Sequence, residues 1–307
     1  MNKLIAYAQL VRLPNTFTAM ADIFLGALAT GLILRNWMVF LCLLVSSTFL
    51  YWSGMIWNDY FDLDQDRKER PGRPLASGRV TLRAAVFLAI GLMIGGLILA
   101  ALAGIRFESS GIVFRWKSLV IAAFLVLAIF LYDGFFKATW AGPVLMGSCR
   151  FLNILLGLSI FSGAIPGWGW LLALIVGAYV AGITWFARTE ARESSQPMLI
   201  AAALVMLGAL VLTLAVPALA IEVSIDFQPS ALFPYVLVAL ASYVGIAVLR
   251  AIRRPEPTNV QPAVKRAILG LVVLDALLAS AFVGSFGLLL AILLIPGIIL
   301  GRWLYST

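Results

Sequence analysis

The most regular feature of the chain is a series of apolar runs, each about 20 residues long, separated by short polar segments. An α-helix of about 20 residues crosses the roughly 30 Å of hydrocarbon in a bilayer, so each run predicts one transmembrane helix. Nine spans follow: residues 16–34, 38–57, 84–104, 118–131, 142–163, 168–187, 197–219, 231–249 and 267–284. A tenth apolar run, residues 286–300, contains Pro296 and could be a short span, a re-entrant segment or an extension of the ninth helix.

The composition agrees with a membrane protein, since 63% of the 307 residues are hydrophobic and 12% are charged. Soluble domains are about half apolar and about a quarter charged, and soluble helices show amphipathic stripes that most of these runs lack. We therefore expect an all-α fold, a polytopic transmembrane helical bundle. The chain has no linker, low-complexity tract or convincing internal repeat, so residues 1–307 are predicted to form a single domain.

The distribution of basic residues predicts the orientation of the bundle. With the N-terminus in the cytoplasm, sixteen Lys and Arg residues fall on the cytoplasmic side, against four on the other side: Arg35, Arg106, Arg115 and Lys117. Basic loops stay in the cytoplasm, so we expect the N-terminus and the acidic loops there, in a multi-pass protein of a bacterial-type inner membrane. These loops and lipid head groups explain the net charge of +8, and nucleic acid is not expected as a partner.

Histidine is absent from the sequence, which excludes imidazole as a catalytic base or metal ligand. The two cysteines, Cys42 and Cys149, lie inside apolar runs and are expected to be buried structural thiols.

One polar segment, residues 58–66, follows the second span without a break and reads Asn-Asp-Tyr-Phe-Asp-Leu-Asp-Gln-Asp. If the helix continues, Asn58, Asp62 and Asp66 recur at every fourth position and form a stripe about 12 Å long. Carboxylates at this spacing repel one another, so a positive group is expected among them. Mg²⁺ is a good match, because it takes oxygen ligands and binds through one or two carboxylates plus substrate phosphates. The nearby basic residues are the other candidates: Arg67, Lys68, Arg70 and Arg73.

Two other interpretations of this segment are weaker. A mixed-charge run is usually a solvated, charge-balanced loop, but this one leaves a membrane helix directly. It places Asn58 and Asp59 near hydrocarbon depth, where polar groups are costly. A Ca²⁺-binding loop beginning at Asp62 would need Gly at the position of Arg67 and Glu at the position of Arg73.

Residues 70–78 come next and read Arg-Pro-Gly-Arg-Pro-Leu-Ala-Ser-Gly. Two prolines and two glycines predict a turn-rich loop that is not helical throughout. Such a loop can carry Arg70 and Arg73 back over the carboxylates, and guanidinium groups bind phosphate oxygens through paired hydrogen bonds.

These two segments together resemble the first aspartate-rich motif of the UbiA superfamily of intramembrane prenyltransferases. The matching pattern is N-D-x-x-D-x-x-x-D followed by R-P-x-R-P-L-x-S-G, at residues 58–66 and 70–78. Three shorter patterns are similar to the same family: Arg12-Leu13-Pro14-Asn15, Tyr132-x-x-x-x-Lys137 and Arg150-x-x-Asn153. The similarity covers roughly the first 190 residues, and beyond them it rests on the hydrophobic pattern.

The resemblance implies a nine-helix bundle with two aspartate-rich loops over a central cavity, where Mg²⁺ bridges the loops and the pyrophosphate of a prenyl diphosphate. The isoprenyl group is then transferred to a lipophilic acceptor, and membrane lipids surround the protein as further partners. Catalytic roles are implied for Asp62, Asp66 and Lys137. Pyrophosphate contacts are implied for Tyr132, Arg70, Arg73, Lys137, Arg150, Asn153, Arg188 and Arg192. Metal ligation is implied for Asn58, Asp59, Asp62, Asp66, Glu190 and Glu193.

The chain departs from the family after the sixth span. There the family has a second motif, D-x-x-x-D, whereas residues 187–194 read Ala-Arg-Thr-Glu-Ala-Arg-Glu-Ser and contain no aspartate. The two glutamates could bind a metal, the two arginines could bind phosphate, or the four charges could neutralise one another in an inert loop. A loop of this kind is similar to that of a divergent branch of the superfamily found in Ebo-type bacterial operons.

Other polar and aromatic residues have two interpretations each. Arg150 contacts phosphate, as the resemblance implies, or pairs with Asp133. Asp22 and Asp275 are expected to face the bundle interior and to hydrogen-bond between helices. The aromatic residues near the site either steady an allylic cation or anchor the protein at the membrane interface: Tyr132, Phe135, Trp185 and Phe186.

Three functions compete on these observations. The first is a Mg²⁺-dependent transferase that moves an isoprenyl group from its diphosphate to a lipophilic acceptor. The second is a non-catalytic lipid-binding or transport component with the same fold. The third is a CDP-alcohol phosphotransferase, but its D-G-x-x-A-R signature is absent, because Asp133-Gly134 is followed by Phe-Phe-Lys-Ala.

Overall fold

The computed structural model describes residues 3–108, 111–190, 193–223 and 228–305 of the chain. The first half contains α1 (Lys3–Leu10), η1 (Leu13–Asn15), α2 (Thr16–Ala29), α3 (Trp37–Phe61), α4 (Leu63–Glu69), α5 (Leu82–Ala103), β1 (Ile105–Glu108), β2 (Gly111–Phe114), α6 (Lys117–Leu131) and η2 (Tyr132–Phe136). The second half contains α7 (Gly142–Leu158), α8 (Gly167–Phe186), η3 (Ala187–Thr189), α9 (Gln196–Leu212), η4 (Thr213–Ala215), α10 (Val216–Val223), α11 (Phe233–Arg253), α12 (Pro257–Val283), η5 (Gly284–Leu293) and α13 (Leu294–Tyr305).

The nine predicted spans all fall on helices, which confirms the all-α bundle. Seven helical stretches of the described residues are long and apolar enough to cross a membrane. α2 has 14 residues and α7 has 17, which is shorter than the usual length of a crossing helix. Nine membrane crossings therefore stay a prediction.

Two glycines bring α2 and α7 into backbone contact. A β-carbon at Gly26 would lie 2.7 Å from the carbonyl oxygen of Ile154, and one at Gly157 would lie 2.8 Å from that of Ile23. Membrane helices approach closely where small residues meet, so this crossing fixes α2 against α7. It also fixes the polar side chains that the two helices carry toward the centre of the bundle.

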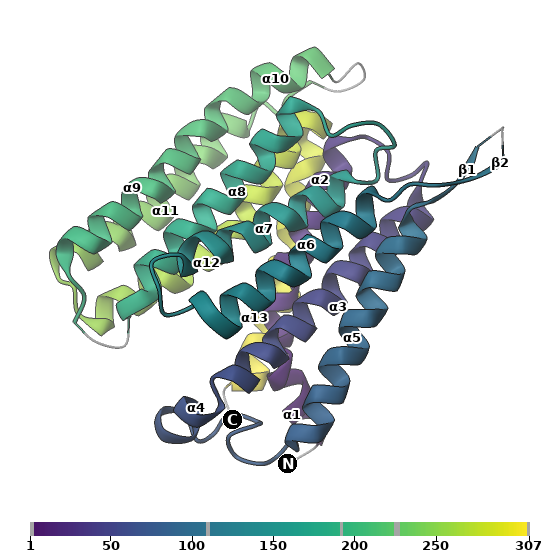
Figure 1. The fold of residues 1–307 in the computed structure, drawn as a ribbon. Helices are drawn as coiled ribbons and strands as arrows, with labels where there is room; N and C mark the ends of the chain where they lie inside the picture. Colours follow the sequence, from purple (N-terminus) through teal and green to yellow (C-terminus); the bar gives the residue numbers. More distant parts are fainter. Residues whose placement is uncertain (1–2, 109–110, 191–192, 224–227, 306–307) are drawn as a thin grey trace.

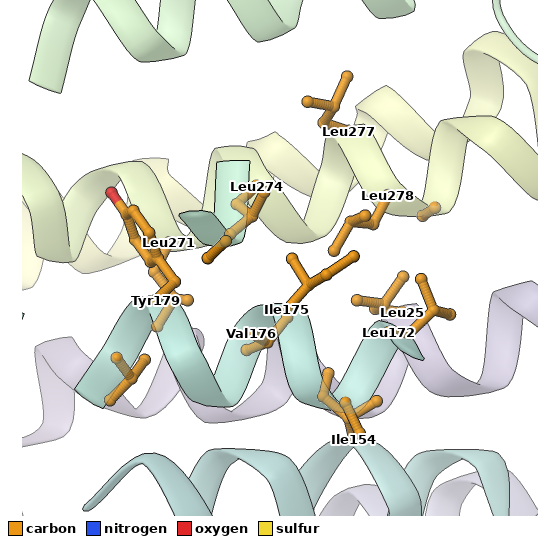
Figure 2. Packing of buried hydrophobic residues seen from close by; sticks show 14 of the residues in the cluster. Leu25, Ile154, Leu172, Ile175, Val176, Tyr179, Leu271, Leu274, Leu277 and Leu278 are labelled. Carbon is orange, nitrogen blue, oxygen red and sulfur yellow. The ribbon is translucent and has the colours of Figure 1, made fainter. Parts of the chain in front are cut away.

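The largest apolar cluster of the protein surrounds α8. Figure 2 shows the side chains of α8 between those of α12 on one side and Ile154 of α7 on the other, with Leu25 of α2 beside Leu172. The α8 residues of this layer are completely buried: Leu172, Ile175, Val176 and Tyr179. The hydroxyl of Tyr179 donates to the carbonyl oxygen of Ala267 in α12, 3.2 Å away, so the one polar atom of this layer is satisfied.

The tenth apolar run is not an extension of the ninth helix. The chain turns at Gly284, whose φ of 62° favours glycine, and η5 then packs beside α12 and α2. α13 reaches back to the N-terminal segment, where the side chain of Gln9 donates to the carbonyl oxygen of Leu304 at 2.8 Å. Figure 1 shows α1 and α4 at one end of the bundle and the β1–β2 hairpin at the opposite end.

The β1–β2 hairpin is the one piece of β-structure among the described residues. Ile105 pairs with Phe114 and Glu108 with Gly111 in an antiparallel register. The hydrophobic pattern predicts only a connection between two spans here, because two runs of four residues are too short for alternation to separate a strand from a loop.

Candidate functional site

A cavity of about 400 Å³ lies among α2, α3, α6, α7, α8 and α12. Its apolar walls include Leu125, Ile129, Ile183 and Leu271. Polar side chains line it in two groups. We call the mouth the group near the helix ends beside the first motif, namely Arg12, Tyr132, Asp133 and Glu190. We call the floor the deeper group, namely Thr18, Ser47, Arg150 and Asn153.

The position of these groups along α3 gives the depth of the cavity. Asn58 hydrogen-bonds to two residues of the mouth, Arg12 and Asp133. Ser47, in the floor, lies eleven residues earlier on the same helix, or about 16 Å along its axis. An elongated apolar molecule with a charged head therefore matches the dimensions and the polarity of this space.

Ion pairs hold the first acidic motif together. Arg73 Nη1 lies 2.6 Å from Asp66 Oδ2 and 3.4 Å from Asp59 Oδ1, and Arg12 Nη2 lies 3.1 Å from the same oxygen of Asp59. Asp59 and Asp66 are 3% and 4% exposed, and charges so deeply buried require such partners. The expectation that positive groups stand among these carboxylates is confirmed.

The predicted four-residue spacing persists across the junction between α3 and α4. The backbone N–H of Asp62 donates to the carbonyl oxygen of Asn58, and that of Asp66 donates to the carbonyl oxygen of Asp62. Asn58, Asp62 and Asp66 therefore keep helical spacing, although α3 ends at Phe61. The exposed Asp64 points away and pairs with Arg67 at 3.2 Å.

The π-helix η2 forms the facing side of the mouth. Lys137, directly after it, forms a salt bridge with Asp62, and Asn58 Nδ2 donates to Asp133 Oδ1 at 2.6 Å. π-helical segments are rare and are frequent at functional sites. This one brings Tyr132 and Asp133 into the cavity wall and leaves Phe135 exposed.

The loop after α4 folds as its prolines and glycines predict. Gly78 has φ of 72°, a conformation that favours glycine, and the N–H of Val80 donates to the carbonyl oxygen of Pro74. Arg73 returns over the carboxylates. Arg70 is exposed and lines a second hollow of about 510 Å³, which adjoins the mouth at Arg12.

The loop after α8 has few contacts with the site. Glu190 lines the mouth, whereas Glu193 is exposed and is not among the residues that line the cavity. Arg188 Nη2 donates to the carbonyl oxygen of Ala138 at 2.5 Å, and its guanidinium lies 5.0 Å from the ring centre of Trp140. Arg192 lies outside the described residues.

Electrostatics connect this loop to the first motif. Partial burial raises the pKa of the Glu190 carboxyl above its ordinary value, and the positive charge of Arg70 opposes that rise. The two loops therefore lie on the same side of the bundle, as expected. That a metal and a pyrophosphate bridge their carboxylates stays a prediction.

At the floor, Arg150 pairs with Asp22, so the alternative pairing with Asp133 is wrong. Arg150 Nη1 donates to Asp22 Oδ2 at 3.0 Å, and Asn153 Nδ2 donates to the same oxygen at 2.8 Å. The expectation that Asp22 hydrogen-bonds between helices is confirmed, since these bonds join α2 to α7. Contact of Arg150 and Asn153 with a pyrophosphate stays a prediction.

Two residues of the mouth were not assigned a role from the sequence. Arg12 belongs to a pattern similar to the family's opening, but nothing in that pattern indicates its partners, which lie 46 and 47 positions away. Among the described residues it is the one non-glycine residue with a positive φ, 49°. Strain of this kind clusters at functional sites. Asp133 was considered only as a partner of Arg150, and its contact with Asn58 depends on the π-helix.

The donor atoms of the first motif suit Mg²⁺, because carboxylate and amide oxygens are the hard ligands that this ion prefers. In the described ranges, no three acidic or thiol side chains converge closely enough to chelate a metal. Mg²⁺ commonly uses one or two carboxylates and completes its shell with water and substrate phosphates. The residues therefore fit a metal that is bound together with a diphosphate.

Comparison with known sequences identifies the family. Residues 19–269 match the UbiA prenyltransferase family. The digeranylgeranylglyceryl phosphate synthase of Saccharolobus solfataricus is 30% identical over 177 residues, which are 56% of each chain. That of Methanospirillum hungatei is 27% identical over 184 residues, or 59% of this chain and 58% of the relative. The chain spans about half the length of these curated relatives.

Comparison with solved structures identifies the same fold. A digeranylgeranylglyceryl phosphate synthase structure has a TM-score of 0.65 at 21% identity, covering 92% of this chain and 99% of the other. A UbiA homologue from Archaeoglobus fulgidus, bound to GPP and Mg²⁺, has a TM-score of 0.60 at 15% identity, covering 89% and 99%. Membership of the Ebo-type branch stays a prediction. The family match covers most of the chain and the fold agrees with it, so the protein belongs to the UbiA prenyltransferase family.

Proposed function

We propose that this protein is a Mg²⁺-dependent membrane transferase that moves an isoprenyl group from a prenyl diphosphate to a lipophilic acceptor. The observation that carries the proposal is the apolar-walled cavity, whose mouth adjoins the carboxylates of the first motif and the basic residues Arg73 and Lys137 that pair with them. A diphosphate with an isoprenyl chain has the same division between a charged head and an apolar body. The solved relative that is bound to GPP and Mg²⁺ supports this class of donor.

In this mechanism, Asn58, Asp59, Asp62 and Asp66 would hold the metal, and a bound Mg²⁺ would supply positive charge near the departing pyrophosphate. Arg70, Arg73 and Lys137 donate hydrogen bonds to the phosphate oxygens and stabilise the charge that develops on them. The bond between the first isoprenyl carbon and the pyrophosphate oxygen breaks, the acceptor forms the new bond to that carbon, and the proton that the acceptor loses passes to the departing pyrophosphate. The apolar walls exclude water from the allylic carbon, and Tyr132 offers an aromatic face beside it.

The loop after α8 contributes less to this proposal than the first motif. Glu190 is proposed as its metal ligand, because its carboxylate lines the mouth. Glu193 and Arg188 are not among the residues that line the cavity, so we assign them a smaller part in binding metal and pyrophosphate. Arg192 keeps its role in pyrophosphate binding as an expectation from the sequence alone.

The orientation and domain structure are also proposals. We propose one domain in a bacterial-type inner membrane, with the N-terminus, α4 and the Arg-rich loop in the cytoplasm. The charge asymmetry of sixteen basic residues against four supports this. The arrangement of α1 and α4 at one end and the hairpin with Arg106 at the other agrees with it (Figure 1).

The names of the sequence relatives suggest the chemistry of the acceptor. They are digeranylgeranylglyceryl phosphate synthases, whose product joins isoprenyl chains to glyceryl phosphate. We propose a lipid with a hydroxyl or an aromatic nucleophile as the acceptor class for this chain, and the assay below tests it without a prior choice of acceptor.

The test is incubation of the purified protein with labelled prenyl diphosphates of several chain lengths and a membrane lipid extract, with and without Mg²⁺. We expect a new labelled lipid that forms only with Mg²⁺ and not in the Asp66→Ala variant. Binding of the donor without any labelled product, over all chain lengths and extracts, would overturn the transferase and favour the lipid-binding component.

A further inference from the structure

Beneath the floor of the cavity lies a group of three charged side chains that the proposed mechanism does not use. Asp22 of α2 and Asp275 of α12 are both 0% exposed. Arg150 of α7, whose side chain is 16% exposed, lies between them and the cavity that it lines. Two carboxyl groups and one guanidinium are thus enclosed in the middle of a membrane bundle, where intramembrane charges are costly.

The hydrogen bonds of this group are unequal. Asp22 Oδ2 accepts from Arg150 Nη1 and from Asn153 Nδ2, and Arg150 Nη2 donates to Thr18 Oγ1 at 2.7 Å. No N–H or hydroxyl group of the described residues donates to Asp22 Oδ1 or to either oxygen of Asp275. α2 and α12 pack against each other and bring the two carboxyl groups within reach of one another, and a hydrogen bond between them exists only if one carries a proton.

The charges around the pair require the same proton. Arg150 is the cation that acts on both carboxyls, and Tyr51 of α3 acts on Arg150 in turn. The neighbouring α8 and η5 carry no charged residue, and the arginines of α11 stand in its last turn, beside the start of α12. Two ionised carboxylates in contact would repel each other and leave one charge without compensation. Asp22, which accepts two hydrogen bonds, is the better carboxylate, and Asp275 is the better acid.

We propose that Asp22 and Asp275 hold one proton between them, and that the Asp22–Asp275–Arg150 group is therefore electrically neutral. Arg150 then forms part of a polar but charge-compensated floor, and Asp22 and Asp275 are positioning residues. This assigns a role to two buried acids that belong to no motif of the chain.

The consequence for function rests on the proposed transfer reaction. Arg12 in the mouth and Arg73 and Lys137 in the adjoining first motif are cations beside carboxylates, whereas the floor offers no net charge to an anion. A prenyl diphosphate then binds with its head at the mouth and its chain toward the floor. An uncompensated Arg150 would attract the diphosphate toward the floor, away from the metal-binding motif.

The proton itself is tested by infrared spectroscopy of the purified protein at neutral pH. We expect a carbonyl stretching band of a protonated carboxylic acid that is lost in Asp275→Asn and in Asp22→Asn, because each change removes the pair. Asp64→Asn is the matched control, since Asp64 is exposed and should leave the band unchanged. A wild-type protein without the band, or a band that survives both substitutions, overturns the assignment. This test requires no substrate, so its outcome is independent of the transferase proposal.

The positioning role is tested with inorganic pyrophosphate as the probe, in the absence of Mg²⁺. The Asp22→Asn/Asp275→Asn double variant leaves Arg150 uncompensated and should bind pyrophosphate at least about tenfold more tightly than the wild type. Adding Arg150→Gln to the double variant should reverse this gain. The single Asp275→Asn variant should bind like the wild type, because an amide donates to Asp22 as the protonated acid does.

Unchanged pyrophosphate affinity in a folded double variant overturns the positioning role. The single variants keep the proton assignment testable if the double variant does not fold.

Discussion

The first acidic motif and the loop after α8 border the same cavity with very different sets of partners. In the first motif, Asp59, Asp62 and Asp66 each form a salt bridge with a basic residue that comes from the motif's own loop or from another part of the chain. In the second loop, Glu190 lines the mouth and forms no salt bridge with another described residue, and Glu193 is exposed to solvent. Among the described residues, the carboxylates of the first motif are therefore held in place by more charged partners than Glu190 and Glu193 are.

This difference indicates which residues contribute most of the free energy of metal and diphosphate binding. A preorganised set of charges pays little for ordering when the ligand arrives, whereas a sparse loop must be ordered by the ligand itself. We therefore expect the first motif to dominate binding and turnover, with a graded contribution from Glu190 and little from Glu193. Substitutions in the two loops test this ranking.

The largest effect is expected from Asp66→Ala or Asp62→Ala. Each removes a proposed metal ligand, and we expect turnover to fall by at least about a hundredfold, equivalent to about 2.7 kcal/mol. The bundle should stay folded, since these side chains bind ions and do not pack in the apolar core. The control is Asp64→Ala, because Asp64 is exposed and pairs only at the surface. Loss of the folded protein with unchanged donor binding in the remainder would favour a structural role.

A smaller but clear effect is expected from Arg12→Ala. Arg12 hydrogen-bonds to both Asn58 and Asp59, so its loss removes charge-assisted bonds worth about 1.5–3 kcal/mol. Donor binding should weaken by about tenfold to a hundredfold, as measured by titration of a prenyl diphosphate with Mg²⁺. Arg67→Ala removes an exposed ion pair and should leave the affinity unchanged. Equal affinities for the Arg12 and Arg67 variants would remove Arg12 from the site.

The second loop is tested by a matched pair, Glu190→Gln and Glu193→Gln. A carboxamide keeps the shape and removes the charge that holds a hard cation, so Glu190→Gln should reduce turnover by about tenfold. Glu193→Gln should have little effect, because Glu193 does not line the cavity. Steady-state kinetics at several Mg²⁺ concentrations distinguish the two. The reverse order of effects would mean that the loop rearranges when the ligand binds.

The smallest effect is expected from Arg188→Ala. Its guanidinium contacts Trp140 and the carbonyl oxygen of Ala138, and an exposed cation–π contact contributes about 0.5–1 kcal/mol. We expect a small decrease in the thermal midpoint and nearly unchanged turnover. A severe loss of pyrophosphate affinity would instead show that Arg188 binds phosphate, and that the second loop acts through its arginines rather than its glutamates.

The sequence predicted the fold well because each apolar run reports one helix. It predicted the contact of Arg73 with the first motif because the prolines of residues 70–78 allow few paths for the chain. It did not predict the partners of Arg12 or Asp133, because these depend on a strained backbone and on a π-helix that no local pattern indicates. The pairing of Arg150 with Asp22 was missed for a related reason. It depends on the close crossing of α2 and α7 at Gly26 and Gly157, which are 131 residues apart in the chain.

The C-terminal segment shows the same limit. Residues 286–300 read as an apolar run with several possible arrangements, and hydrophobicity alone does not distinguish them. The positive φ of Gly284 and the hydrogen bond from Gln9 to Leu304 show that this run is not an extension of the ninth helix. The conformation of one glycine and one hydrogen bond between distant residues leave no repeating pattern in the sequence.

The central claim is that the first motif binds a metal and a prenyl diphosphate together at the mouth of the cavity. The most direct measurement is thermal unfolding of the purified protein with geranyl diphosphate, in Mg²⁺ and in a chelator, because a ligand that binds only the folded state must raise the midpoint. The account predicts protection of the wild type and of Asp64→Asn in Mg²⁺, with little protection in the chelator or in Asp66→Asn. Equal protection with and without Mg²⁺, or full protection of Asp66→Asn, would contradict it.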